Sequence, residues 1–386
     1  MQTGKDYDVA VIGAGVFGVW IAYQLNRAGL SVLLLDAYGP GNSRASSGGE
    51  SRIMRLGYGP DAIYTRSAQR SLQLWKQFFE EYQSPTPLFH RTGVLWLARG
   101  QDTYCEATLK TLKDVGAKAE RLTRTQLTER FPQLNFNGVD WAILERDAGV
   151  LMARRAVQAV AAAARANGVE YLEEAVSGPI SEQDSGNLRT TSGTEIRARQ
   201  LVFACGPWLS KLFPDLLSER IHVTRQEVFF VGVPPGNDSF KPNRLPAWVD
   251  FNDLVYALPD LDNRGFKIAI DEHGPEFDPD DGERIVSTEL TNAVRNYLRQ
   301  RVPLLADAPF TETRVCQYEN TSNGDFLIDR HPVLENVWLV GGGSGHGFKH
   351  GPTVGEYVTA MLSGHGTPEP RFSLATKDRV QQRKVY

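Results

Sequence analysis

The stretch that decides the fold lies near the amino terminus and reads YDVAVIGAGVFGVWIAYQLNRAGLSVLLLD, residues 7–36. Its first six residues form a β-branched run that is typical of a strand buried on both faces. Three glycines with the G-x-G-x-x-G spacing follow: Gly13, Gly15 and Gly18. A helix is predicted over 19–28, and a second strand, 31–35, ends at Asp36. This order of strand, glycine turn, helix, strand and acid predicts a βαβ unit that binds a dinucleotide.

Each glycine in this unit has a separate physical task. Gly13 permits the tight turn, Gly15 lets the backbone approach a pyrophosphate, and Gly18 lets the helix pack closely on the strand. The phosphates would lie at the helix amino terminus, where free N–H groups and the helix dipole favour negative charge. Asp36 would accept hydrogen bonds from the adenosine ribose, which argues against NADP. Up to this residue, the sequence does not separate NAD from FAD.

The loop that follows favours FAD. Residues 39–55 read GPGNSRASSGGESRIMR, where a nicotinamide enzyme would normally continue to a third strand. A long loop of small residues suits a cofactor that enters deeply, with Ser46 and Ser47 available to the pyrophosphate or flavin; a surface turn is the alternative. The loop is expected to lead into a helix, on which Arg52 and Arg55 would share one face. In a cleft this pair would bind an anion, whereas on the surface it would have no such role.

Further helices, strands and glycine-rich motifs of the kind found in the amino-terminal unit follow along the rest of the chain. They are an alanine-rich helix over 153–167, strands over 168–176, 198–204 and 337–340, the motif CGPW at 205–208, the glycine cluster GGGSGHGFKHGP at 341–352, and a helix over 353–362. The glycine cluster repeats the phosphate-loop pattern of the amino terminus. One nucleotide-binding domain is therefore predicted to consist of pieces scattered along the chain.

Composition narrows the class of partner. The 386 residues suffice for two hydrophobic cores or one large core. The 42 basic and 46 acidic residues form no long single-sign run, so no nucleic-acid partner is expected. The apolar run 9–25 is broken by glycines and fits neither a signal peptide nor a membrane span, which predicts a cytoplasmic protein without a membrane partner. The 3 cysteines fit neither a disulfide framework nor a zinc site, so no metal is expected.

Taken together, the motifs resemble those of a known family. The set comprises GAGVFG (13–18) with Asp36, GESRIMR (49–55), ACGPW (204–208), VCQY (315–318) and SGHGFK (344–349). It resembles the FAD-dependent amine oxidases of the D-amino-acid oxidase superfamily, above all the branch of monomeric sarcosine oxidase and N-methyltryptophan oxidase. The resemblance covers nearly the whole chain and implies a monomer that uses FAD.

The resemblance also implies how a substrate would be held. Arg55 and Lys349 match the pair that binds the substrate carboxylate, and Tyr256 and Tyr318 match aromatic residues that line the pocket. A carboxylate removed from water requires cations with good hydrogen-bond geometry, which supports the first assignment. The implied reaction is the oxidation of a secondary or N-substituted amino acid, of the sarcosine, N-methyl amino acid or pipecolate type, to an imine, with oxygen reduced to hydrogen peroxide.

Other residues are implied to act on the flavin. Cys316 matches a cysteine that carries the flavin through a thioether, which predicts covalent FAD. Arg52 matches an arginine near the flavin, and Lys267 matches a lysine that takes part in oxygen activation. The residues expected to be catalytic are Lys267, Arg52 and Tyr318. Those expected to bind FAD are Gly13, Gly15, Val16, Phe17, Gly18, Asp36, Ser46, Ser47, Arg52, Val176, Cys316, Gly343, Gly345, Gly347 and Lys349.

The sequence departs from the sarcosine branch at two places. That branch has histidines and a threonine before the first arginine, whereas this chain has SSGGES at 46–51. It also has a pocket histidine four residues after the lysine, where this chain has Asp271; His273 lies nearby but out of register. Because the parts around the amine differ, sarcosine itself is not expected to be the best substrate.

The expected fold is α/β, with a Rossmann-like FAD-binding domain and a substrate domain built on a mainly antiparallel β-sheet. The FAD-binding domain would comprise 1–85, 147–218 and 324–386, and the substrate domain 86–146 and 219–323. Three other functions stay open on this basis: an FAD-dependent dehydrogenase or 2-hydroxy-acid oxidase on the same fold, an NAD-dependent dehydrogenase, and a non-catalytic FAD-binding assembly factor.

Overall fold

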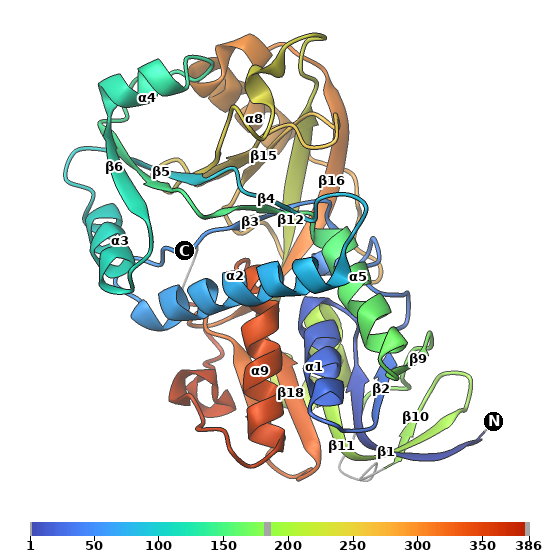
Figure 1. Ribbon diagram of the computed structural model, residues 1–386. Helices are drawn as coiled ribbons and strands as arrows, with labels where there is room; N and C mark the ends of the chain where they lie inside the picture. Colours follow the sequence, from blue (N-terminus) through green and yellow to red (C-terminus); the bar gives the residue numbers. More distant parts are fainter. Residues whose placement is uncertain (1, 181–186, 383–386) are drawn as a thin grey trace.

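The computed structural model describes residues 2–180 and 187–382. Two large β-sheets organise the chain, and Figure 1 shows them as a lower and an upper layer with helix α2 (Ala62–Tyr82) crossing between them. Among the described residues, no helix combines the length and the apolar character that crossing a membrane requires.

The lower sheet has seven strands and is mostly parallel. Its order is β17-β18-β11-β1-β2-β9, with β10 paired to β11. The strands are β1 (Gln2–Ile12), β2 (Val32–Leu35), β9 (Glu170–Leu172), β10 (Asn187–Arg189), β11 (Glu195–Phe203), β17 (Leu327–Arg330) and β18 (Val337–Gly341). The sheet confirms that segments far apart in the sequence form one structural unit.

Helices cover this sheet closely. Helix α1 (Val16–Arg27) packs against α5 (Ala153–Ala166) and α9 (Gly351–Leu362) on one face, as Figure 1 shows. The α1–α9 contact depends on Gly355, because a Cβ there would lie 2.7 Å from the carbonyl oxygen of Trp20. The buried ring of Trp20 meets that of Trp75 on α2 edge to face at 5.0 Å, which ties α2 to the same core.

The upper sheet has eight strands in the order β16-β12-β15-β14-β13-β5-β7-β6, antiparallel except between β13 and β5. Its strands are β5 (Val94–Ala98), β6 (Ala119–Thr123), β7 (Trp141–Glu145), β12 (Ile221–Val231), β13 (Ala247–Asp250), β14 (Val255–Leu258), β15 (Phe266–Ile270) and β16 (Phe310–Thr321). The helices nearby are α3 (Thr103–Asp114), α4 (Arg124–Arg130) and α8 (Thr288–Arg301), and the short helices α6 (Leu209–Leu212) and α7 (Pro214–Leu217) precede β12.

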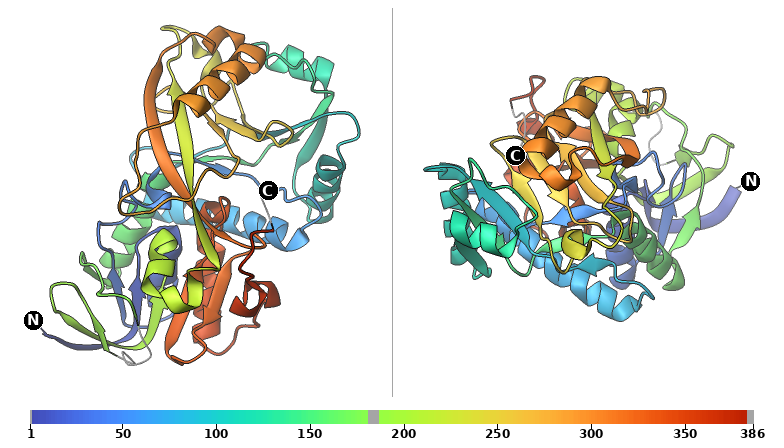
Figure 2. Two further views of the ribbon diagram at one scale, coloured as in Figure 1. Left: turned by 180° about the vertical axis from the view of Figure 1, so that it is seen from behind. Right: turned by 90° about the horizontal axis from the view of Figure 1, so that it is seen from above.

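The long strands β12 and β16 connect the two layers. They pair along almost their whole length, and Figure 1 and the left panel of Figure 2 show them running from the upper layer down to the lower one. The ladder pairs Gln226 with Cys316 and Thr224 with Tyr318. Residues of the upper sheet are thereby brought to the loops at the edge of the lower sheet.

Two local predictions were wrong. Arg52 begins a strand, β3 (Arg52–Met54), and does not lie on a helix with Arg55. Strand β3 forms because it pairs with β8 (Gly149–Leu151), which also pairs with β4 (Phe89–His90), and these partners are distant in sequence. The strand predicted over 168–176 is limited to β9; beyond it, only an isolated bridge joins Val176 to Thr190.

All strands of the lower sheet come from 1–85, 147–218 and 324–386, and all strands of the upper sheet come from 86–146 and 219–323. We therefore propose these ranges as the two domains. The small β3-β8-β4 sheet takes strands from both sets of ranges and lies where they meet.

Candidate cofactor and substrate site

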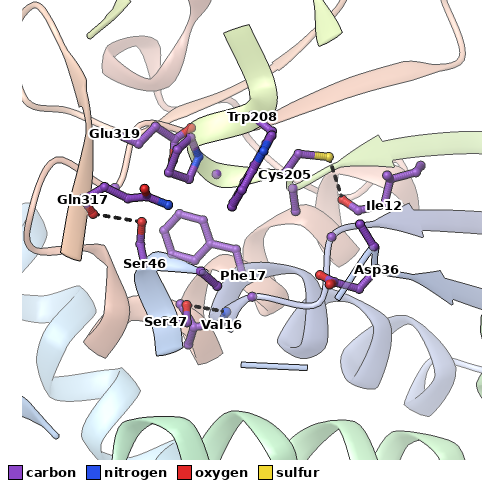
Figure 3. A pocket seen from close by; sticks show the side chains of 18 of the residues that line it. Ile12, Val16, Phe17, Asp36, Ser46, Ser47, Cys205, Trp208, Gln317 and Glu319 are labelled. Atoms are coloured by element: carbon purple, nitrogen blue, oxygen red, sulfur yellow. Dashed lines mark hydrogen bonds between the residues drawn. The ribbon is translucent and has the colours of Figure 1, made fainter. Parts of the chain in front are cut away.

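A cavity of about 470 Å³ lies at the carboxyl ends of the parallel strands, where ligands of open α/β sheets bind. It opens between the glycine loop after β1 and the loop after β18. Figure 3 shows part of its lining. The residues predicted to bind the cofactor that line it are Gly13, Gly15, Val16, Phe17, Asp36, Ser46, Ser47, Arg52, Val176, Gly343, Gly345 and Gly347. This cavity is the candidate cofactor site.

Hydrogen bonds fix the floor of the cofactor site. The Asp36 carboxylate accepts from the backbone N–H groups of Ala14 at 2.7 Å and Tyr38 at 2.8 Å, and its burial raises its pKa. The hydroxyl of Ser47 accepts from the N–H of Val16 at 3.0 Å, at the start of α1. The 3-10 turn that carries this serine (Ser46–Gly48) is thus attached to the helix amino terminus, as Figure 3 shows.

The residues present fit a dinucleotide such as FAD. Gly15 is the N-cap of α1 and offers no side-chain cap, and a Cβ there would meet only the Ser47 hydroxyl, at 3.5 Å. The helix amino terminus is therefore open to a phosphate. On the opposite side in Figure 3, Glu319 has a buried carboxyl oxygen without a hydrogen-bond partner in the described part of the chain. Burial raises the pKa of Glu319 to about 7, and FAD carries N–H and O–H donors that could satisfy this oxygen.

Three residues predicted to bind the cofactor do not line this cavity. Gly18 packs against the turn instead, since a Cβ there would lie 1.8 Å from the carbonyl oxygen of Gly13. Cys316 and Lys349 line a neighbouring cavity.

Two residues of the cofactor site could not be found from the sequence. The first is Trp208, which lines the site and donates from its indole N–H to Asp280 at 2.7 Å. Its motif was visible as ACGPW, but the position of its side chain was not. The second is Glu319, which has no local signal.

The neighbouring cavity, of about 90 Å³, is the candidate substrate site. The predicted catalytic and substrate-binding residues all line it: Arg52, Arg55, Tyr256, Lys267, Tyr318 and Lys349. Arg52 and Tyr318 also border the cofactor cavity, as do Gly345 and Phe348. The two cavities therefore share a wall, so that a cofactor in one could contact a substrate in the other.

Two cations meet on one wall of the substrate cavity. The guanidinium of Arg55 lies over the ring of Tyr58 at 4.3 Å and donates to the carbonyl of Gly57 at 2.5 Å. The ammonium of Lys349, in the turn Gly347–His350, donates to the hydroxyl of Tyr58 at 2.9 Å. Burial, and next the charge of Arg55, lower the pKa of Lys349 well below its usual value. An anionic ligand would relieve this repulsion, as expected of a carboxylate site.

A buried acid, Glu145, supports this pair from behind. Its carboxylate accepts from the N–H groups of Leu56 and Gly57 and from the indole of Trp96, at 2.6–3.0 Å. Glu145 thereby fixes the backbone next to Arg55. Burial raises the pKa of Glu145, and the three hydrogen bonds and the charge of Arg55 offset part of this rise. Nothing in the local sequence around residue 145 signals this role.

Lys267 and Tyr318 stand elsewhere in the cavity, on the upper sheet. Lys267, on β15, donates to the carbonyl of Ser51 at 2.8 Å, and burial lowers its pKa well below the usual value. Tyr318, on β16, donates to the carboxylate of Asp271 at 2.7 Å. The sulfur of Cys316 lies 3.5 Å from a guanidinium nitrogen of Arg52, next to both Lys267 and the cavity. The cavity thus brings together residues from six separate segments, 51–55, 226–228, 249–256, 267–273, 316–318 and 344–349.

Comparisons with known proteins find relatives over nearly the whole chain. The family described as "FAD dependent oxidoreductase" (DAO) matches residues 8–361. Monomeric sarcosine oxidase of Arthrobacter sp. (strain TE1826) is 30% identical over 98% of both chains. N-methyl-L-tryptophan oxidase of Salmonella heidelberg (strain SL476) is 28% identical over 95% of this chain and 97% of its own length.

The fold is also found among solved structures. The crystal structure of L-proline dehydrogenase from P. horikoshii superimposes with a TM-score of 0.83 at 23% identity, covering 96% of this chain and 97% of that chain. At this identity the likeness shows the shared fold. The family match, by contrast, spans most of the sequence, including both glycine-rich loops. The chain therefore belongs to the family of FAD-dependent oxidoreductases.

Proposed function

We propose that the protein oxidises a secondary or N-substituted amino acid to an imine and passes the electrons to oxygen, with hydrogen peroxide as the product. The observation that carries this proposal is the Arg55–Lys349 pair in a cavity that shares a wall with the cofactor site. The names of the sarcosine and N-methyltryptophan oxidases support the substrate class. FAD, when bound, would supply the two-electron acceptor.

The chain's own residues would bind and orient the substrate. Arg55 and Lys349 would hold its carboxylate, with Tyr58 beneath both cations. Fixing the carboxylate directs the carbon next to nitrogen toward the shared wall, and such positioning supplies a large part of a rate enhancement. Phe251, Tyr256 and Phe348 would exclude water around the apolar part.

Lys267 would act on oxygen. Its ammonium nitrogen is buried and hydrogen-bonded to Ser51, and burial holds its pKa well below the usual value. A cation held here would stabilise negative charge that develops on oxygen during reduction.

We further propose that Cys316 forms a thioether with the flavin and that the protein acts as a monomer. The sulfur lies beside Arg52, which borders the cofactor cavity. Denaturation of the holoenzyme with acid should leave the yellow colour in the pellet, and the change Cys316→Ala should release it to the supernatant. Colour released from the unaltered protein would contradict the tether.

The reaction is tested with an oxygen electrode and a peroxide assay. N-methyl amino acids and pipecolate should consume oxygen and form an equal amount of hydrogen peroxide, while their 2-hydroxy acid counterparts should not. Turnover of hydroxy acids alone would indicate a hydroxy-acid oxidase instead. Turnover of amines with a dye, but without oxygen consumption, would indicate a dehydrogenase.

A further inference from the structure

The substrate cavity contains a carboxyl group that the proposed reaction does not use. Asp271 directly follows β15 and is the only acidic residue among the described residues that line this cavity. One of its oxygens accepts the hydrogen bond from the hydroxyl of Tyr318 at 2.7 Å. No described residue donates a hydrogen bond to its other oxygen.

The charges that act on Asp271 are those of the carboxylate-binding pair. Arg55 and Lys349 both favour its ionised form, while burial raises its pKa to about 6. The other titratable or charged groups that line the cavity are Arg52, Tyr256, Lys267, His273, Cys316, Tyr318 and His346. At neutral pH the cavity therefore holds a carboxylate close to both cations.

The acid in the cavity favours a ligand that carries a positive charge beside its carboxylate. Arg55 and Lys349 would hold the carboxylate, and Asp271 lines the same cavity, close enough for both cations to act on it. A simple carboxylic acid would place its negative charge near the Asp271 carboxylate without a positive charge of its own, which is unfavourable. An amino acid with a protonated amine would bring its own positive charge. Its nitrogen is separated from the carboxylate by a single carbon, so it must lie close to the same residues.

We propose that Asp271 is a specificity-determining residue that binds the substrate nitrogen in its protonated form, with the free carboxylate oxygen as hydrogen-bond acceptor. The same oxygen would take the ammonium proton before oxidation, because only the neutral amine can form the imine. The inference deepens the proposed function and rests on it. Through Asp271 the enzyme selects zwitterionic amino acids against carboxylic acids of the same shape.

The test compares 2-aminoisobutyrate with pivalate. The two compounds have the same shape and differ only where an ammonium group replaces a methyl group. Neither can be oxidised at this position, because the carbon next to the carboxylate carries no hydrogen in either compound. The dissociation constant of each is measured at neutral pH from the change in the flavin absorption spectrum of the holoenzyme.

The unaltered enzyme should bind 2-aminoisobutyrate at least about tenfold more tightly than pivalate. The change Asp271→Asn should abolish this preference, Asp271→Glu should retain it, and Glu272→Gln, which removes an exposed charge one residue away, should leave it unchanged. The inference would be overturned if the unaltered enzyme bound the two compounds equally, a measurement that needs no variant. It would also be overturned if Asp271→Asn kept the full preference. Either result would leave the carboxylate site intact. If neither compound changes the spectrum, the proposed carboxylate site fails and the inference fails with it.

Discussion

The change Gly15→Ala should weaken FAD binding without weakening the fold. Gly15 has φ −71° and ψ −177°, which alanine adopts without strain, and the nearest atom to a Cβ would be the Ser47 hydroxyl at 3.5 Å. The free energy of unfolding of the apoprotein should therefore stay within about 0.5 kcal/mol. The same Cβ would project toward the expected pyrophosphate and hold it away from the amino terminus of α1.

The expected loss of affinity follows from the helix terminus. An anion at a partly buried helix amino terminus gains up to about 2 kcal/mol, so its displacement should raise the dissociation constant about 10–30-fold. The measurement is a titration of apoprotein with FAD, followed by flavin fluorescence, in a Cys316→Ser background where binding is reversible. Thermal unfolding of the same apoproteins reports on the fold.

Gly18→Ala is the matched contrast. Its Cβ would lie 1.8 Å from the carbonyl oxygen of Gly13, far inside van der Waals contact, so it should destabilise the apoprotein by about 3 kcal/mol or more. Thermal unfolding should thus separate the two alanine variants clearly. If Gly15→Ala binds FAD as tightly as its parent, the pyrophosphate does not pass over Gly15 and the proposed cofactor position is wrong.

Three further predictions concern the substrate cavity. Arg55→Met should raise KM about 10–100-fold, as expected for the loss of a charged hydrogen bond, while the change of exposed Arg66→Met should not; steady-state kinetics with an N-methyl amino acid decides. Lys267→Met should slow reoxidation by oxygen about a hundredfold while substrate still bleaches the flavin, and equal slowing of both half-reactions in stopped flow would refute the assignment. Because the pKa of Asp271 is raised to about 6, its carboxyl is ionised above that pH and neutral below it. The preference for 2-aminoisobutyrate over pivalate should therefore be full at about pH 8 and fall toward about pH 5.5, where pivalate is still mostly ionised, whereas the ratio in Asp271→Asn should stay constant. A preference of the unaltered enzyme that does not fall over this range would exclude Asp271 as its source.

The cofactor-binding unit could be predicted because its signals are local. The strand, the glycines and Asp36 lie within 7–36, and each acts on its immediate neighbours. Such features can be interpreted one by one from residue type and spacing.

The substrate cavity could not be predicted in this way. Arg55 and Lys349 meet across Tyr58 although nearly the whole chain separates them, and only the resemblance to a family paired them. The predicted helix at Arg52 failed because pairing with β8, a distant strand, overrides local preference. Glu145 is identified only by the three donors around it, which come from other segments.

The most direct test of the central claim is an anaerobic spectrum of the holoenzyme during addition of pipecolate or an N-methyl amino acid. The account predicts that the flavin absorbance bleaches within the time of one turnover and returns when air is admitted, with one hydrogen peroxide formed per flavin. A flavin that no secondary amino acid bleaches, but that a 2-hydroxy acid or a reduced nicotinamide does, would contradict it.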